Sequence, residues 1–141
     1  MGRINWSRVF LGGLAWWAVF ILLWVVAMFL YLGTEATASW NVLGLQFPWG
    51  PEFVVFWLVF VYVRGVMAVW LYAAIRPRYG PGPKTAVRAG LGLWLIGKFM
   101  PMMFLGAVGL FPLRFAVISM ATDLVLMVAA TVAGAWLYTE E

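Results

Sequence analysis

The chain has 141 residues, of which 66% are hydrophobic and 10% charged, and its formal net charge is +4. With a mean hydropathy of +1.00, it cannot present the charged surface that a soluble domain of this size needs. The sequence has no cysteine and no histidine, which excludes disulfides, thiolate nucleophiles and the usual zinc and haem ligands. We therefore predict an all-α integral membrane protein, and we expect no catalytic residue, metal or cofactor.

Length limits the architecture of such a protein. A spanning helix takes about 20 apolar residues at about 1.5 Å rise each, so four helices with their loops use the whole chain. The apolar runs predict spans at residues 9–32, 51–75, 85–106 and 113–138. We expect one four-helix transmembrane bundle without a separate soluble domain.

The first span carries no charge. It is longer than the roughly 7 to 15 apolar residues of a signal peptide and no A-x-A-like site closes it, so we expect it to be retained. Residues 33–50 are too polar to span a membrane. A short interfacial helix over residues 36–45 and an ordered loop are both compatible with this segment.

The second span contains a single internal charge, Arg64. Pro51 and Glu52 are typical of a helix start, because proline fits the first turn and a carboxylate favours the positive end of the helix dipole. Residues 76–84 contain three prolines and two glycines. Such a run cannot be helical throughout, so we expect the span to end near residue 75.

The third span is interrupted by Lys98 and Pro101. Pro101 should kink the outer part of this helix and is a candidate hinge. Small residues on this span favour close approach of a neighbouring helix; they are Ala86, Ala89, Gly90, Gly92 and Gly97.

The fourth span carries Asp123 near its centre. A tight connection at residues 107–112 makes the third and fourth spans antiparallel neighbours. Small and polar residues recur on one side of the fourth span and should face protein. They are Ala116, Ser119, Met120, Asp123, Met127, Ala130 and Gly134.

Basic residues near the helix ends predict the orientation. Arg114 stands alone on one side, and the other side holds Arg3, Arg8, Arg76, Arg78, Lys84 and Arg88. Because positive residues stay cytoplasmic, both termini should be cytoplasmic. The basic charge is then a topology signal, and nucleic-acid binding is not expected.

The basic segment has two interpretations. Its side chains, Arg76, Arg78, Lys84 and Arg88, are suited to contact an anionic lipid headgroup or a protein partner, at about 1 kcal/mol per basic residue near an anionic surface. Alternatively, they only anchor the topology.

Residues 73–86 contain the run Arg76-Pro77-Arg78-Tyr79-Gly80-Pro81-Gly82-Pro83-Lys84-Thr85-Ala86, and residues 133–138 close the chain with Ala-Gly-Ala-Trp-Leu-Tyr. Both segments resemble those of a group of small, uncharacterised bacterial four-helix membrane proteins. The resemblance covers roughly the second half of the chain. It implies a multi-pass protein of the bacterial cytoplasmic (inner) membrane with a cytoplasmic turn at this run, and it implies no particular activity. Such relatives often have an acidic residue in the first span, which this chain lacks.

Arg64, Lys98 and Asp123 are expected at one depth, about 15 to 20 Å from their helix starts and therefore near the middle of a core about 30 Å thick. An isolated charge there costs about 2.5 kcal/mol or much more, so pairing is expected. Lys98 should pair with Asp123 because the tight turn joins their helices. Arg64 is then either a second partner of Asp123 or extends towards the interface.

Two interpretations of this charged level stay open. In the first, the Asp123 carboxylate holds the helices in register. The protein then acts by packing, as an oligomer or as an accessory subunit of a membrane complex. In the second, the surplus positive charge attracts an anion or Asp123 and Lys98 exchange protons, and the protein is a small proton- or anion-coupled transporter or channel. A cleft for lipid or a hydrophobic ligand is a further alternative, lined by Met100, Met102, Met103, Met120 and Met127.

Overall fold

The computed structural model describes residues 4–46 and 50–139, and Arg3 lies outside this part of the chain. The described residues form helices and turns, with no strand among them. The helices are α1 (Trp6–Ala27), α2 (Gly33–Val42), α3 (Pro51–Tyr79), α4 (Pro83–Trp94), α5 (Met100–Ala107) and α6 (Leu113–Trp136), with π-helical segments η1 (Met28–Leu32) and η2 (Leu95–Phe99). The prediction of an all-α chain is confirmed.

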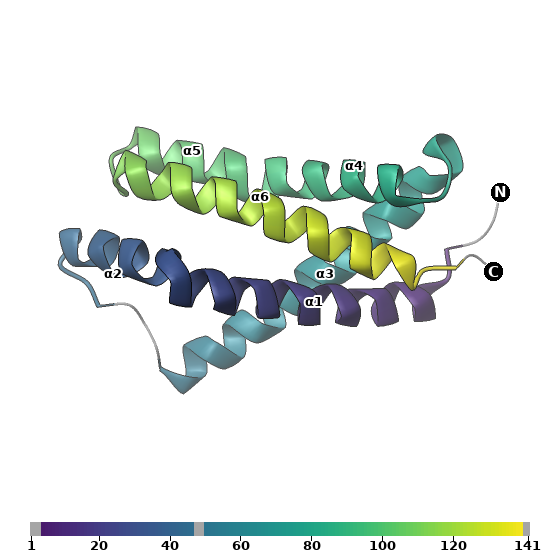
Figure 1. Ribbon diagram of the computed structural model, residues 1–141, viewed down its shortest axis with the longest axis horizontal. Helices are drawn as coiled ribbons and strands as arrows, with labels where there is room; N and C mark the ends of the chain where they lie inside the picture. Colours follow the sequence, from purple (N-terminus) through teal and green to yellow (C-terminus); the bar gives the residue numbers. More distant parts are fainter. Residues whose placement is uncertain (1–3, 47–49, 140–141) are drawn as a thin grey trace.

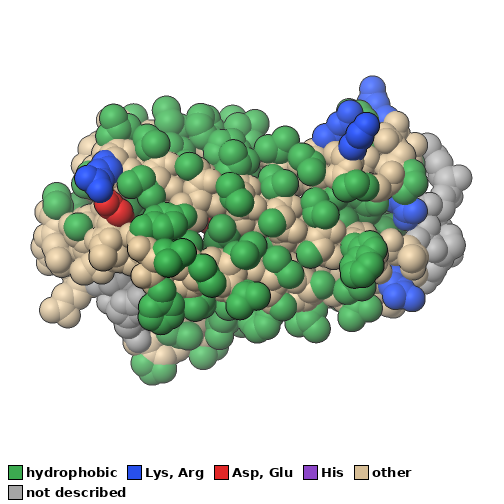
Figure 2. Space-filling model, in the orientation of Figure 1, with side chains coloured by type: hydrophobic (Ala, Val, Ile, Leu, Met, Phe, Trp, Pro, Cys, Tyr) green, Lys and Arg blue, Asp and Glu red, His purple; other side chains and the backbone are tan. Residues whose placement is uncertain are grey.

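These helices join into four continuous rods, each long and apolar enough to cross a membrane. The rods are Trp6–Val42, Pro51–Tyr79, Pro83–Ala107 and Leu113–Trp136. The start of α1, the end of α6 and the α3–α4 turn lie together at one end of the molecule (Figure 1). On the face drawn in Figure 2, charged side chains gather at the two ends, and hydrophobic side chains cover the band between them.

The first rod is longer than the sequence indicated. It passes through η1 and α2 and has 37 residues, about 55 Å at 1.5 Å per residue. The helix does not end at residue 32, whereas the position of the membrane span within it stays a prediction. Residues 36–42 belong to α2, which continues the rod to Val42, so they form neither a separate interfacial helix nor a loop, and residues 43–45 lie outside the helix. Thr34 and Thr37 do not interrupt the helix, since their hydroxyls donate to the Tyr31 and Gly33 carbonyls, each at 2.8 Å.

The second rod also continues beyond its predicted end at residue 75. Helix α3 contains Pro77 and ends at Tyr79, where the Gly80 N–H donates to the Arg76 carbonyl at 2.8 Å. Within residues 76–84, only residues 80–82 lie outside a helix. The predicted basic turn over residues 76–84 is therefore wrong in its extent. Gly80 and Gly82 have φ angles of 81° and 118°, which glycine adopts without strain.

The third rod contains a π-helical segment at the place where the sequence predicted a kink. The Met100 N–H donates to the Leu95 carbonyl, five residues earlier, and Pro101 follows immediately. Since proline lacks an N–H, a widened turn just before it accommodates the missing hydrogen bond. A short connection around Gly109 then leads into α6, which ends at Trp136, two residues before its predicted limit.

The small and polar stripe of α6 is buried, as predicted, and packs against α1 and α4. The backbones approach most closely at glycines. A Cβ atom on Gly134 would lie 2.7 Å from the Gly12 carbonyl oxygen, and one on Gly65 would lie 2.7 Å from the Gly13 carbonyl oxygen. Helix α1 therefore contacts α6 and α3 backbone to backbone. Of the small residues on the third rod, Gly97 is exposed, contrary to the prediction.

Helix α3 crosses the other rods obliquely, and its first half runs away from α5 and α6 (Figure 1). Residues 51–60 include no buried residue. This half is held to α1, where the Trp17 indole donates to the Leu58 carbonyl at 3.0 Å and the Trp24 and Trp57 ring centroids lie 4.4 Å apart. We call residues 51–60 the outer half of α3.

Candidate functional site

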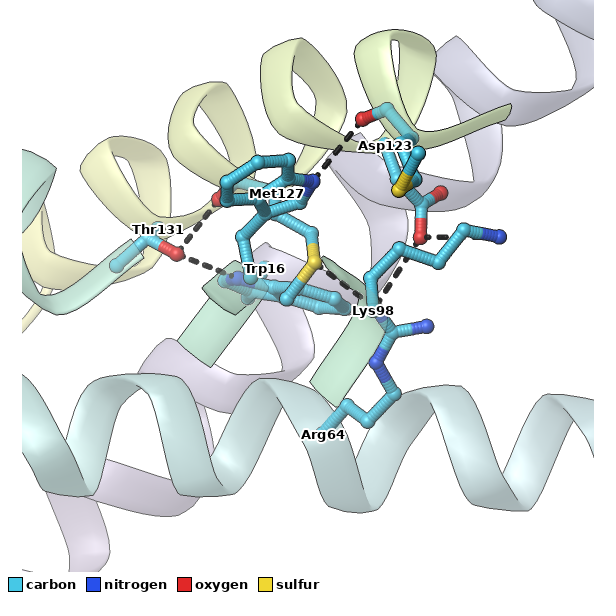
Figure 3. A network of polar contacts seen from close by, with 8 residues as sticks. Trp16, Arg64, Lys98, Asp123, Met127 and Thr131 are labelled. Atoms are coloured by element: carbon cyan, nitrogen blue, oxygen red, sulfur yellow. Dashed lines mark hydrogen bonds and ion pairs between the residues drawn. The ribbon is translucent and has the colours of Figure 1, made fainter. Parts of the chain in front are cut away.

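The three predicted intramembrane charges meet at one point. Arg64 comes from the middle of α3, Lys98 from η2 and Asp123 from the middle of α6 (Figure 3). The Asp123 Oδ2 atom lies 3.6 Å from Arg64 Nη2 and 3.9 Å from Lys98 Nζ. One carboxylate oxygen thus bridges two cations, and Arg64 is a second partner of Asp123 rather than a side chain that extends to the interface.

The charge cluster, defined as Arg64, Lys98 and Asp123, is largely removed from the surface. The three side chains are 18%, 24% and 11% exposed, respectively. Both distances exceed the 2.7 to 2.9 Å typical of charge-assisted hydrogen bonds, so the contacts are ion pairs. Two cations and one carboxylate leave the cluster with a formal charge of +1.

Aromatic rings of α1 support the Arg64 guanidinium. Its Cζ atom lies 5.2 Å from the Phe20 ring centroid and 5.9 Å from that of Trp16. The two rings stack with centroids 4.8 Å apart. Arg64 Nη2 also donates to the Met127 sulfur at 2.9 Å. The two rings attract the cation through their quadrupoles. Together with the sulfur, they give Arg64 stabilising partners besides the carboxylate.

Trp16 and Phe20 were not among the predicted site residues. A signal for them was present, because aromatic residues four apart share one face of a helix and the span that carries them has no charge of its own. Such a face is a natural partner for an arginine on a neighbouring span.

Hydrogen bonds fix the helices around the cluster. The Trp16 indole donates to Thr131 Oγ1 at 2.9 Å, and Thr131 donates to the Met127 carbonyl at 2.6 Å (Figure 3). On the other side of α6, the Trp94 indole donates to the Met120 carbonyl at 3.0 Å. Thus α1 and α4 are both tied to α6 within eight residues of Asp123.

Both π-helical segments lie beside the same part of α6. Segment η2 carries Lys98, and segment η1 carries Tyr31, whose hydroxyl lies 2.8 Å from Thr122 Oγ1, next to Asp123 in the chain. Such segments are rare and frequently occur at functional sites. Pro101, the candidate hinge, is the second residue of α5, and Met100 separates it from η2. Pro101 indicated a disturbance there, whereas no feature of the sequence predicted η1.

The predicted basic set is divided by the structure. Arg78 and Arg88 both lie over the Tyr79 ring, at 5.9 and 4.8 Å, and Lys84 is exposed nearby. Arg76 is on another side of this end, over the Tyr138 ring at 5.7 Å. At the opposite end of the molecule, Arg114 and Glu35 form an ion pair of 2.7 Å that joins α6 to α2.

The fold and the site define a class: a helical protein with four rods apolar enough to cross a membrane and a charge cluster between them. Among the described residues, no group of acidic side chains is arranged to hold a metal ion. Neither a protein-family model nor a curated protein nor a solved structure matches the chain.

Proposed function

We propose that this chain is a multi-pass protein of the bacterial cytoplasmic membrane, with both termini cytoplasmic, that acts by packing against other membrane proteins. It does so as an oligomer or as an accessory subunit of a membrane complex. The observation that carries the proposal is the row of exposed large side chains on the outer half of α3. The excess of basic residues at one end supports the orientation, because positive residues stay cytoplasmic.

The internal contacts of the chain favour packing over exchange of ions. The carboxylate of Asp123 already pairs with both cations of the charge cluster, and Arg64 is further held by aromatic rings. Because the three charges pair with one another, they fix the relative positions of α3, η2 and α6. Its role is then structural, and the surface available for function lies elsewhere.

The outer half of α3 is that surface. Phe56 is 66% exposed, and Val55, Val59 and Phe60 are also exposed, although this half of the helix is rich in large side chains. Transmembrane helices associate through close packing, and aromatic side chains bury much area when they find a partner. We infer that a helix of another subunit, from a second copy or a different protein, packs along this half.

The absence of cysteine allows a direct test of this surface. Phe56→Cys introduces a single thiol on the outer half of α3, and Val117→Cys places a control thiol on α6, also near the outer end and 51% exposed. In isolated membranes, a thiol-specific cross-linker is expected to join Phe56→Cys into dimers or larger adducts, while Val117→Cys stays monomeric. Equal cross-linking of the two variants, or none at Phe56→Cys, would contradict the packing proposal.

A small proton- or anion-coupled transporter is the second candidate. The observation that favours it is the charge of +1 on a cluster flanked by two π-helical segments, with Pro101 as a hinge next to Lys98. Intramembrane charges of this kind often mark ion pathways.

Flux measurements separate the two candidates. Under the packing proposal, proteoliposomes show no proton or chloride flux above that of protein-free vesicles. Transport would instead give a flux that disappears in Asp123→Asn and Lys98→Met and persists in Arg78→Gln, which removes an exposed charge at the end of α3. That second pattern would overturn the structural role of the charge cluster.

A further inference from the structure

A cavity of about 340 Å³ lies at the end of the molecule that holds the α3–α4 turn. Residues from the last turns of α3 and α6 and the first turn of α4 line it. These three segments lie at the same end of the molecule (Figure 1). Arg76 supplies the charge on its wall, and Tyr72 and Tyr138 supply hydroxyl groups. None of its described lining residues is acidic.

The polar groups of this cavity are hydrogen-bond donors. The Tyr72 oxygen accepts the Gly82 N–H at 3.1 Å, and the Tyr138 oxygen accepts the Asn5 N–H at 3.3 Å. Each hydroxyl therefore has its own proton to donate, and a guanidinium can only donate. The positive end of the α4 dipole, at Pro83, borders the same space. Such a lining fits an anion with several oxygen atoms, such as a phosphate group.

The remaining wall of the cavity is apolar and runs along the membrane-spanning rods. Ala86 of α4 and Val132 and Ala135 of α6 form this wall, and Trp136 stands beside it with 86% of its surface exposed. An exposed tryptophan at the end of an apolar rod is typical of the headgroup region of a bilayer. A polar group bound at Arg76 would thus continue into an apolar chain along α4 and α6.

We propose that this cavity binds the phosphate of an anionic phospholipid, with an acyl chain along α4 and α6. The inference rests on membrane insertion, which is part of the proposed function. Arg76 is the specific contact in this site. Arg78 and Arg88, which flank Tyr79 at the exposed surface, add only the general attraction of basic residues to an anionic membrane.

Native mass spectrometry of the purified full-length protein tests the site, with phosphatidylglycerol and phosphatidylcholine as probes. Arg76→Gln is expected to lower the retention of phosphatidylglycerol about tenfold, the loss typical of one charge-assisted contact. The wild-type protein should retain phosphatidylcholine less than phosphatidylglycerol, because the choline cation offsets the charge of the phosphate. Arg78→Gln is the matched control, since it removes the same charge from the same helical turn, and it should retain the lipid. Trp136→Ala, at a highly exposed position, should also weaken retention without affecting folding.

Equal losses in Arg76→Gln and Arg78→Gln would overturn the proposal in favour of diffuse surface attraction. Displacement of the lipid by millimolar inorganic phosphate would identify a soluble-anion site instead. Thermal melting checks the folding of each variant. If Arg76→Gln does not fold, the retention of phosphatidylglycerol by Trp136→Ala is compared with its retention by the exposed control Phe104→Ala. A lower retention by Trp136→Ala supports the site, and equal retention contradicts it. Resistance of the wild-type protein to alkaline extraction from vesicles tests membrane insertion separately, so a failure of insertion is distinguished from a failure of the lipid site.

Discussion

Asp123→Asn is expected to lower the free energy of unfolding by about 3 to 5 kcal/mol, which is the usual cost of leaving a buried charge without its partner. The reason is that Asp123 bridges Arg64 and Lys98 and is itself 11% exposed in its side chain. An asparagine has nearly the same shape, so the packing changes little, but two neighbouring cations lose their only carboxylate in the charge cluster.

Lys98→Met is the informative comparison. It removes the more exposed cation, whose nitrogen lies 3.9 Å from the carboxylate, and leaves a neutral pair of Arg64 and Asp123. Its effect should stay within about 1 kcal/mol, because replacing a buried charge by an apolar side chain of similar size is often neutral once the remaining charges balance. The double variant Asp123→Asn, Lys98→Met should recover part of the loss of Asp123→Asn alone, since it leaves a single cation.

Unfolding of these variants is measured by tryptophan fluorescence during titration with a denaturing detergent in mixed micelles. If Lys98→Met costs as much as Asp123→Asn, Lys98 is an essential member of the charge cluster rather than the surplus cation. If Asp123→Asn costs nothing, the carboxylate does not hold the helices together.

Gly134→Ala is expected to cost about 3 kcal/mol, at the upper end of what overpacking a close-packed interior costs. Its new methyl group would lie 2.7 Å from the Gly12 carbonyl oxygen and 2.9 Å from a Val69 methyl carbon. The backbones of α1 and α6 would have to separate, and Trp16, whose Cβ lies 3.1 Å from the same position, would move with α1.

The matched control is Gly106→Ala in α5, where an added Cβ atom meets nothing within 4 Å. This change should be neutral or slightly stabilising, because alanine favours a helix more than glycine does. The same detergent titration measures both variants. Equal stability of Gly134→Ala and Gly106→Ala would show that α1 and α6 do not approach each other as closely as described.

Composition and periodicity were sufficient for much of the fold. Long apolar runs require helices in a protein of this hydropathy, and the stripe of small residues on α6 identified its buried face because close helix packing selects such residues. The scarcity of charges made Arg64, Lys98 and Asp123 conspicuous, and the cost of burying a charge alone predicted that Lys98 pairs with Asp123. The position of Arg64 stayed open, because a long side chain near the middle of a span can also extend towards the interface.

Other features depend on three-dimensional context that the sequence does not display. Polar residues such as Thr34 and Thr37 suggested a helix end, but their hydroxyls bond to the backbone of the same helix. Pro77 suggested a turn, yet α3 continues through it to Tyr79. The contact of Arg64 with Trp16 and Phe20 depends on the rotation of α1 about its axis, which residue spacing alone does not determine.

The oblique course of α3 also bears on the shape of the molecule within a bilayer. The rods meet closely where α1 carries Gly12 and Gly13, and α3 diverges from α5 and α6 towards the opposite end (Figure 1). In the proposed orientation, the molecule therefore takes up more area in the outer leaflet than in the inner one. An inclusion with this taper has its lowest free energy where the outer leaflet is expanded, so the protein should accumulate on membrane that bulges outward.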